Sequence, residues 1–184
     1  SPDVTLVGLL DTDAALFSSD FRGPEKMGQL LTQVGGRAGR AAKPGRVIVQ
    51  THYPDHPLLE ILLEHGYADY AQRLLSERQQ ARLPPYGHLL LLRAEARTLS
   101  VAEDYLHQLR ELASSNEGHG ATIIGPLPSP MQRRAGRFRA QLLVLCPSRR
   151  SAQTAAESLV ASAESLPASR RLRWSLDVDP IDML

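Results

Sequence analysis

The segment 33–40, which reads QVGGRAGR, carries the residues best suited to chemistry. Arg37 and Arg40 are three residues apart, so a helical turn would bring their guanidinium groups near one face. The surrounding glycines let the backbone approach another surface closely. Paired guanidinium groups bind phosphate oxygens and stabilise the charge that develops during phosphoryl transfer. The segment therefore predicts a phosphate site at a domain interface; the alternative is a glycine-rich turn with two surface arginines.

Arginines gather again in the second half of the chain. The formal net charge is only +1, so the overall charge does not indicate nucleic-acid binding. If the strands that carry these arginines are neighbours, they form a basic stripe that could contact phosphates. GC-rich coding also produces an excess of arginine, which is the compositional alternative. The candidate nucleic-acid-binding residues are Arg133, Arg134, Arg137, Arg139, Arg171 and Arg173.

The elements around the first arginine pair predict the end of a parallel-sheet domain. Residues 4–10 form a nearly continuous apolar run, which is typical of a parallel strand buried on both faces. A loop over 11–23 follows, and Pro24 marks the start of a helix. Gly35 and Gly36 weaken that helix, and residues 46–51 form a second strand. Because the chain opens inside a core strand, we expect it to be a fragment of a longer protein.

The middle of the chain predicts a helical connector. Apolar residues recur at helical spacing from His56 to Arg82, with an interruption at Gly66. The segment 83–87, LPPYG, cannot continue a helix because of its two prolines. We therefore divide the chain into part of one domain, a helical connector and a C-terminal α/β domain. Their ranges are 1–55, 56–83 and 84–184.

The last hundred residues alternate between strand and helix patterns. The order predicted is βαββαβ, which is typical of a ferredoxin-like sandwich of four strands and two helices. A polar connection over 131–136 separates the two central strands. The predicted strands are 88–96, 121–127, 137–146 and 171–179, and the predicted helices are 99–113 and 148–166.

Several functional classes are excluded or made less favourable by the composition. Cys146 is the only cysteine, which excludes an internal disulfide and a cysteine-based zinc site and fits a reducing, cytosolic compartment. No apolar run approaches the roughly 20 residues that span a bilayer, so no membrane partner is expected. Asp177, Asp179 and Asp182 could mimic a metal site, but their alternation before a proline favours a solvated strand face. We expect no metal ligands in the chain.

Residues 33–40 resemble motif VI of superfamily-two helicases, whose pattern is Q-x-x-G-R-x-x-R. The preceding VTLVGLLDTDAALFSSDFRGPEKMGQLLTQ resembles the motif V region of one branch, the PriA family of replication-restart helicases. The resemblance continues through RVIVQTHYPDHPLL, RLPPYGH and the terminal WSLDVDPID, and so covers essentially the whole chain. The arginine motif is shared by many helicases, whereas DTDAALFSSDFR and LDVDPID are more specific.

The resemblance implies a partial RecA-like helicase lobe, with motifs V and VI, before the ferredoxin-like domain. It implies that Gln33, Gly36, Arg37 and Arg40 belong to an ATP site, with Arg40 as the arginine finger. No phosphate-cradling G-x-x-x-x-G-K-[ST] loop is present. In the family that loop, the magnesium site and a zinc insertion lie upstream. ATP, Mg²⁺ and zinc are therefore expected in the full-length protein, and this fragment alone is not expected to hydrolyse ATP or bind zinc.

The resemblance also implies partners for the C-terminal domain. These are branched and single-stranded DNA, other primosome proteins and the acidic tail of single-stranded DNA-binding protein (SSB), all in the nucleoid-associated cytoplasm. Arg149 and Gln153 match the tail site and lie one helical turn apart after CPS. A helix start beside a guanidinium group suits a terminal carboxylate. The alternative is an exposed Arg and Gln on an alanine-rich helix.

Together these features predict the C-terminal part of a 3′-to-5′ ATP-dependent DNA helicase. Such a protein recognises stalled forks and restarts replication by primosome assembly. Two alternatives remain at this point. One is another superfamily-two motor, such as a fork-regressing or RNA helicase, and the other is a DNA- or protein-binding module without motor function.

Overall fold

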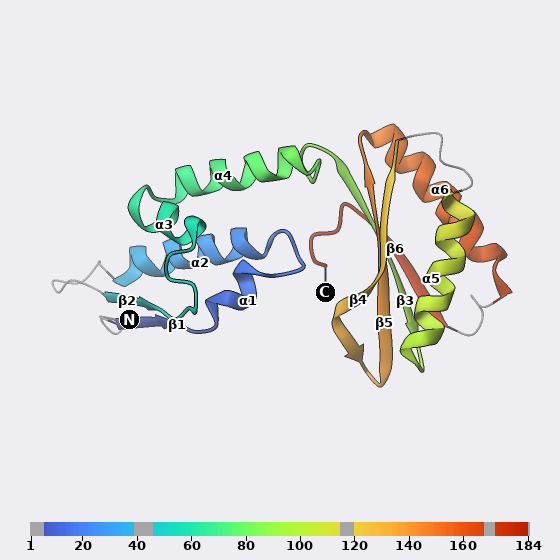
Figure 1. Ribbon diagram of the computed structural model, residues 1–184, viewed down its shortest axis with the longest axis horizontal. Helices are drawn as coiled ribbons and strands as arrows, with labels where there is room; N and C mark the ends of the chain where they lie inside the picture. The colour runs from blue at the N-terminus through green and yellow to red at the C-terminus, as the bar shows by residue number, and fades with distance from the viewer. Residues whose placement is uncertain (1–5, 39–45, 115–119, 168–171, 184) are drawn as a thin grey trace. The chain divides into compact units, whose positions relative to one another are not determined.

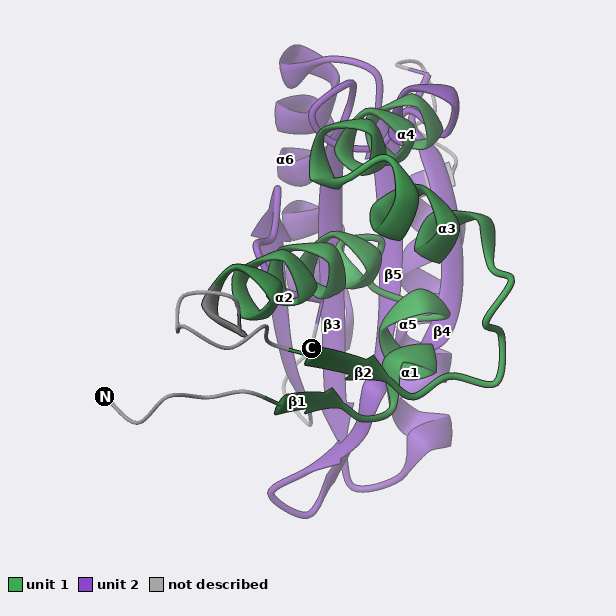
Figure 2. Ribbon diagram, turned by 90° about the vertical axis from the view of Figure 1, so that its left-hand side faces the viewer, with its two compact units in different colours: residues 1–77 green, residues 78–184 purple. Residues whose placement is uncertain are grey.

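The computed structural model describes residues 6–38, 46–114, 120–167 and 172–183. The chain divides into two compact units, Ser1–Glu77 and Arg78–Leu184 (Figure 2). The fold is mixed α/β: a small two-stranded parallel sheet with helices belongs to the first unit, and a four-stranded antiparallel sheet with helices belongs to the second. The three-part division predicted from the sequence stays a prediction.

The first unit begins as the predicted strand–helix–strand. Its elements are β1 (Leu6–Leu9), α1 (Thr12–Leu16), α2 (Gly23–Ala38), β2 (Arg46–Val49), α3 (Pro57–Glu64) and most of α4 (Tyr67–Gln80). β1 and β2 pair in parallel, with Leu6 opposite Arg46 and Leu9 opposite Val49. Gly66 separates α3 from α4 with a φ of +87°, a left-handed conformation that favours glycine. The predicted break at this glycine is confirmed.

The core of the first unit packs helices on one face of the small sheet. Its buried members are Leu16, Met27, Leu31, Leu58, Leu59, Leu62, Tyr70 and Leu74. Gly28 allows the Tyr70 ring to approach α2, because a Cβ at this position would lie 2.3 Å from the ring Cε1 atom. The Tyr70 hydroxyl donates a hydrogen bond to the Pro24 carbonyl, and burial raises the pKa of the phenol. This contact joins α4 to the start of α2.

Three sequence-based expectations for this unit are wrong. β1 is not buried on both faces: Leu6 is 58% exposed and Ile48 of β2 is 51% exposed, because the helices cover only one face of a two-stranded sheet. The predicted loop over 11–23 contains the short helix α1. α2 continues through Gly35 and Gly36 to Ala38, so the intrinsic cost of glycine in a helix is overcome here.

The second unit has the predicted order of elements. They are β3 (His88–Ala96), α5 (Leu99–Ser114), β4 (Thr122–Arg134), β5 (Arg137–Cys146), α6 (Arg149–Ser165) and β6 (Arg173–Val178). The strands lie in the order β4-β5-β3-β6, and all neighbours are antiparallel. Figure 1 shows α5 and α6 on the same face of this sheet.

A single apolar core joins the sheet of the second unit to its two helices. Alternate residues of β3, including Leu90, Leu92 and Ala94, are buried against α5 and α6. Tyr105 of α5 donates its hydroxyl to the carbonyl of Ala163 in α6 at 3.3 Å, and burial raises its pKa to about 12. The helix faces predicted from periodicity therefore supply the core.

The hairpin between β4 and β5 differs from the prediction. The sequence favoured a short strand over 121–127 and a polar connection over 131–136, but β4 runs to Arg134. Only Ala135 and Gly136 form the turn, with φ values of 48° and 77°. β4 is an edge strand, so its three prolines are tolerated, and its pairing shifts register between Ile124 and Leu127 and again before Arg133.

Two smaller expectations concern Cys146 and membranes. Cys146 is a free thiol that is 1% exposed, as predicted for a small buried residue, and burial raises its pKa. Over the described part of the chain, the helices are too short or too polar to cross a bilayer.

Candidate functional site: a pocket at the start of α6

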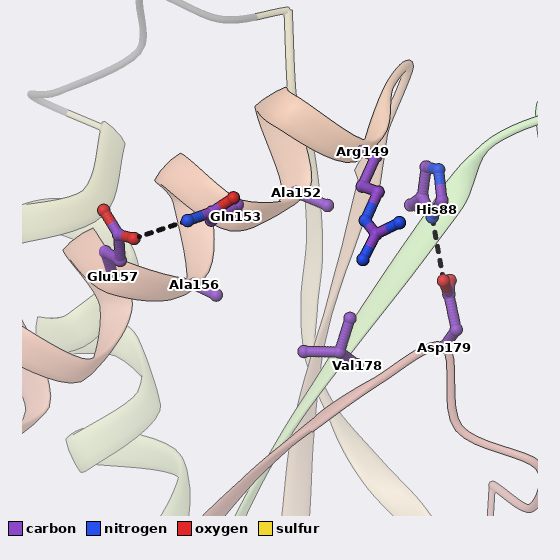
Figure 3. A pocket seen from close by; sticks show the side chains of 8 residues that line it. All are labelled: His88, Arg149, Ala152, Gln153, Ala156, Glu157, Val178 and Asp179. Atoms are coloured by element: carbon purple, nitrogen blue, oxygen red, sulfur yellow. Dashed lines mark hydrogen bonds and ion pairs between the residues drawn. The ribbon is translucent and has the colours of Figure 1, made fainter.

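A pocket of about 530 Å³ lies in the second unit, between the first turns of α6 and the adjoining ends of β3 and β6. The two residues that sequence matching proposed for a tail site, Arg149 and Gln153, both line it. The remaining lining residues are His88, Ala152, Ala156, Glu157, Val178 and Asp179. Figure 3 shows the Arg149 side chain between the helix and the strand ends.

Local sequence places Arg149 at the very start of α6. Pro147 cannot continue a strand ladder, and Ser148 caps the helix, since its hydroxyl accepts a hydrogen bond from the Ser151 N–H at 3.2 Å. Arg149 is thus the first helical residue, where the unpaired N–H groups of the helix carry partial positive charge. The guanidinium adds a full positive charge at the same end, which favours an anionic ligand.

The opposite wall is held by Asp179, which directly follows β6. Its Oδ2 atom lies 2.8 Å from Nδ1 of His88, and its Oδ1 atom accepts a hydrogen bond from the Leu89 N–H at 2.9 Å. The Asp179 N–H donates to the Leu89 carbonyl at 2.7 Å. Asp179 has a φ of 48°, which aspartate tolerates better than most residues. Strand alternation alone predicted a solvated aspartate here, so this role was missed.

Gln153 is engaged within α6. Its Nε2 atom donates to Oε1 of Glu157 at 3.1 Å, and the two side chains point toward each other in Figure 3. The methyl groups of Ala152 and Ala156, together with Val178, give the pocket an apolar surface. The pocket therefore has a cationic group at Arg149, an apolar wall and two carboxylates, of which Asp179 is bonded to His88 and Leu89 and Glu157 to Gln153. The guanidinium and the apolar wall together suit a carboxylate attached to an apolar group.

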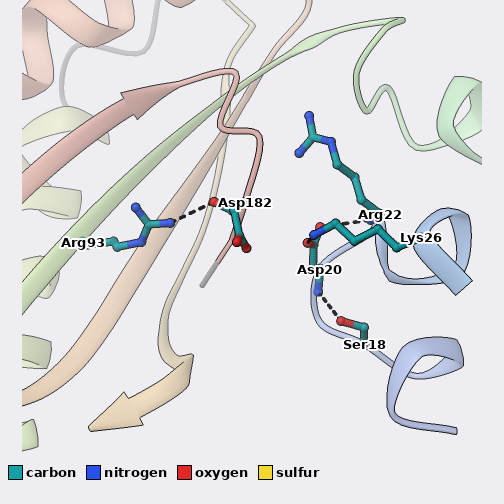
Figure 4. Close-up of polar contacts among 6 residues, drawn as sticks. All are labelled: Ser18, Asp20, Arg22, Lys26, Arg93 and Asp182. Atoms are coloured by element: carbon teal, nitrogen blue, oxygen red, sulfur yellow. Dashed lines mark hydrogen bonds and ion pairs between the residues drawn. The ribbon is translucent and has the colours of Figure 1, made fainter. Parts of the chain in front are cut away.

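The other two aspartates near the C-terminus have partners. Asp177 pairs with the Nη1 atom of Arg93. The Nη2 atom of the same arginine donates to the main-chain carbonyl of Asp182 at 3.0 Å (Figure 4). Asp177 and Asp179 are partly exposed, but each has a side-chain partner, Arg93 for Asp177 and His88 for Asp179, which corrects the sequence-based view of this face. Within the described ranges, His, Cys, Asp and Glu side chains form no cluster able to hold a metal ion.

The predicted basic stripe is only partly formed. Arg133 and Arg134 are exposed at the tip of the β4–β5 hairpin beside Arg137, and the Arg133 guanidinium lies 5.4 Å from the centre of the Phe138 ring. The Arg139 side chain, in contrast, is only 4% exposed, and its Nε atom lies 3.0 Å from Oε1 of Glu95. Burial and this ion pair remove Arg139 from the accessible basic surface.

Sheet order explains why the stripe is interrupted. β3 separates β5 from β6, and Glu95 of β3 lies opposite both Arg139 of β5 and Arg173 of β6. Arg173 is exposed, but an acidic residue lies between it and the arginines of β5. Arg171 lies outside the described residues. The exposed arginines of the hairpin tip are therefore the basic surface that the structure brings together.

The arginine motif of the first unit is described only in part. Gln33 and Gly36 are exposed in the last turns of α2. Arg37 is in the same helix, but its side chain is outside the described part of the chain, and so is all of Arg40. Their contacts with phosphate stay a prediction.

A polar cluster that sequence reasoning missed lies at the carboxyl ends of the two parallel strands. The Asp13 carboxylate accepts hydrogen bonds from the Thr51 hydroxyl and from the His52 N–H at 2.9 Å, and its Oδ2 lies 2.7 Å from the His52 Nδ1. The Thr51 hydrogen bond, followed by that of the His52 backbone, lowers the pKa of Asp13. The carboxyl edge of a parallel sheet is where such groups converge.

The Asp20 carboxylate has partners on both sides of the start of α2. Asp20 pairs with Lys26, with 3.0 Å between Oδ2 and Nζ, and its Oδ1 accepts the backbone N–H of Arg22 at 3.0 Å (Figure 4). The carboxylate therefore joins the start of α2 to the loop before it.

Comparison with known proteins decides the family. The family model of the primosomal protein N C-terminal domain matches residues 79–181, more than half of the chain. The chain belongs to the PriA C-terminal domain family. The first unit lies wholly outside that match, and its relatives are found by comparison with whole proteins.

Relatives of the PriA family align with nearly the whole chain. It is 44% identical over 182 residues to the replication restart protein PriA of Haemophilus influenzae, covering 99% of this chain and 25% of that protein. It is 38% identical over 143 residues to PriA of Bacillus subtilis, covering 78% of this chain and 18% of the relative. PriA of Treponema pallidum is 32% identical over 185 residues, covering 100% of this chain and 27% of the relative. The chain thus spans about a quarter of the length of these relatives.

Proposed function

We propose that this chain is the C-terminal part of an ATP-dependent 3′-to-5′ DNA helicase that restarts replication at stalled forks. The PriA family membership and the names of the relatives support this proposal. In this view β1, α2 and β2 belong to a RecA-like motor lobe. The order β4-β5-β3-β6 supports a ferredoxin-like second unit. This unit would bind DNA and protein partners near the nucleoid.

The observation that carries the partner proposal is the location of Arg149 in the pocket at the start of α6. A free C-terminal carboxylate would lie against its guanidinium and the helix N-terminus, both of which favour negative charge. An apolar terminal side chain would lie against Ala152, Ala156 and Val178. A short peptide tail with an apolar last residue would satisfy both requirements, and the SSB tail implied by the family resemblance is the proposed ligand.

Peptide binding to the 184-residue chain tests this site. A fluorescent peptide with the SSB tail sequence should lose at least tenfold in affinity when Arg149 is changed to Glu, because the charge facing its carboxylate is reversed. Amidating the C-terminus of the peptide should cause a similar loss with the wild-type chain. Equal affinity of wild type and Arg149→Glu for the free-acid peptide would disprove the assignment.

The proposed motor role depends on the arginine motif 33–40, which begins in the last turns of α2. Arg37 and Arg40 would hold the terminal phosphates of ATP, and Gln33 and Gly36 would lie beside them. Phosphoryl transfer in this class needs Mg-ATP and guanidinium groups that stabilise the charge of the transition state. Arg40→Ala in the full-length protein should abolish most ATPase activity while DNA binding is kept, and unchanged turnover would refute the finger role. Zinc and the other primosome proteins would be bound by the full-length protein.

The proposed DNA contact is the tip of the β4–β5 hairpin. The exposed Arg133 and Arg134 and the half-buried Arg137 flank the two-residue turn, where phosphates of branched or single-stranded DNA could reach them. Arg173, together with Arg171, would extend this surface along β6. Arg139 is left out of the proposed contact because it is buried beside Glu95.

A further inference from the structure

The pocket at the start of α6 continues along the helix. A second hollow of about 380 Å³ is lined by Ala156, Glu157, Val160, Ala161 and Glu164. Ala156 and Glu157 line both hollows, so the two adjoin each other along α6, and we call the surface that they make together the α6 trough. Its apolar surface comes from small side chains, which leave room for a ligand that is longer than a single residue.

Charge is distributed unevenly along the α6 trough. Arg149 lies at the amino end of the helix, whereas Glu157 and Glu164 are exposed farther along it. The helix dipole has the same sense, positive at the amino end and negative at the carboxyl end. At a rise of 1.5 Å per residue, Glu157 is about 12 Å and Glu164 about 22 Å from Arg149 along the axis.

These distances define which ligand residues each charge would meet. An extended peptide advances by about 3.3 Å per residue. With its terminal carboxylate at Arg149, a peptide lying in the trough would pass Glu157 about four residues upstream and Glu164 about seven residues upstream. Acidic side chains at those places would meet like charges, which is unfavourable and screened only in part at low salt.

We infer that Glu157 and Glu164 determine specificity in the α6 trough by excluding acidic residues upstream of the ligand's C-terminal residues. This inference rests on the proposed binding of a peptide carboxylate at Arg149. The trough then accepts the last two or three residues of an acidic tail and forces its acidic part out into solvent. A tail with uncharged upstream residues lies along the whole trough. Selection of this kind works through repulsion of the wrong ligand.

A purely local role for Glu157 is separable from this one. Its carboxylate accepts a hydrogen bond from Gln153 at 3.1 Å, an exposed i, i+4 contact that contributes little to stability. Glutamine at 157 keeps the side-chain length and an oxygen acceptor for Gln153 while removing the charge. Glu164 has no such bond to Gln153, so the pair Glu157→Gln and Glu164→Gln isolates the electrostatic effect.

The test compares two fluorescent nine-residue peptides with the same apolar last two residues and a free carboxylate. One carries Asp or Glu at the fourth to eighth positions from its C-terminus, and the other carries Asn or Gln there. Affinity for the wild-type chain and for the double variant Glu157→Gln/Glu164→Gln is measured by fluorescence anisotropy at about 50 mM and about 300 mM salt. Glu111→Gln, an exposed position on α5, removes one negative charge and is the matched control for the single variants Glu157→Gln and Glu164→Gln, which are measured alongside the double variant.

The double variant should bind the acidic peptide about three- to tenfold more tightly at low salt, with little change for the uncharged peptide. The gain should shrink at high salt, and Glu111→Gln should show much less of it. An equal gain for both peptides, or no gain for the acidic one, overturns the specificity role alone, provided that wild-type binding still needs Arg149. If neither peptide binds the wild-type chain in an Arg149-dependent way, the proposed tail site and this inference both fail.

Discussion

Asp179, which directly follows β6, contacts His88, the first residue of β3, with 2.8 Å between Oδ2 and Nδ1. The same carboxylate accepts the N–H of Leu89, a residue that is 1% exposed. One side chain therefore closes the end of a strand pair and forms the wall of the pocket that faces Arg149. A change at Asp179 should therefore affect both the stability of the second unit and ligand binding in the pocket.

Changing Asp179 to Ala should lower the free energy of unfolding by about 1–3 kcal/mol, because the Leu89 N–H loses its side-chain acceptor. Alanine is also less favourable than aspartate at a φ of 48°. Urea unfolding followed by circular dichroism measures the change. Asp104→Ala, on an exposed position of α5, is the control and should be near neutral. Equal effects of the two changes would contradict the role of Asp179.

Gly28 and Gly35 give opposite predictions although both lie within α2. A Cβ at Gly28 would lie 2.3 Å from the Tyr70 ring, so Gly28→Ala should destabilise the first unit by about 1–3 kcal/mol through overpacking. At Gly35 no described atom lies within 4 Å of an added Cβ, and Gly35→Ala should stabilise the helix by up to about 1 kcal/mol. Thermal unfolding of both variants checks the sign of each effect.

A rise in the free energy of unfolding for Gly28→Ala would contradict the overpacking, because it would mean that the Tyr70 ring moves aside without losing packing energy. The companion variant Tyr70→Phe removes only the hydrogen bond to the Pro24 carbonyl and should lower the free energy of unfolding by about 1 kcal/mol. Comparison of the two variants separates the packing contribution of the ring from that of its hydroxyl.

Asp13 should make stability depend on pH on the acid side. Hydrogen bonds from Thr51 and His52 lower its folded-state pKa below the ordinary value of 3.8. A lowered pKa means that the contribution to stability is complete above the unfolded-state value and is lost as the pH falls through the folded-state value. Between pH 5 and pH 2, the unfolding midpoint of Asp13→Asn should therefore fall less than that of wild type. Parallel curves for the two proteins would exclude this contribution.

The hairpin arginines should govern DNA affinity without contributing to a sequence preference. Removing one arginine that binds a phosphate should reduce the slope of log K against log salt by about 0.7–0.9. The double change Arg133→Ala/Arg134→Ala should thus weaken binding of branched DNA and flatten its salt dependence by up to about 1.4–1.8. Arg73→Ala, at an exposed arginine of α4 in the first unit, is the charge-matched control for each single change, Arg133→Ala or Arg134→Ala. A decrease of the same size with Arg73→Ala would place the DNA-binding surface elsewhere.

Several features of the fold were predictable because they depend on local periodicity. Strand alternation gave β3 and β5 the residue ranges His88–Ala96 and Arg137–Cys146, which the structure confirms. The Ser148 cap and the apolar face of α6 also depend only on neighbouring residues in the sequence. The location of Arg149 at a helix start was therefore predictable as well. Family motifs added the expectation that this arginine and Gln153 belong to one site.

Other features depended on which strands become neighbours, and alternation cannot show this. β3 lies between β5 and β6, so Glu95 interrupts the predicted arginine stripe and pairs with the buried Arg139. Leu6 lies in the run 4–10 that was expected to be buried on both faces, but it is exposed because exposure depends on how many faces of a sheet are covered.

By itself the sequence determined the order of the elements, the helix and strand faces and the family. Each of these depends on patterns of residues that are close together along the chain. Only the tertiary structure decided that Asp179 meets His88 across 91 positions and that Asp13 meets Thr51 and His52. It also decided that the two hollows along α6 adjoin each other at Ala156 and Glu157. Such contacts arise from the packing of distant segments, and pairing over those distances leaves no periodic signal in a single sequence.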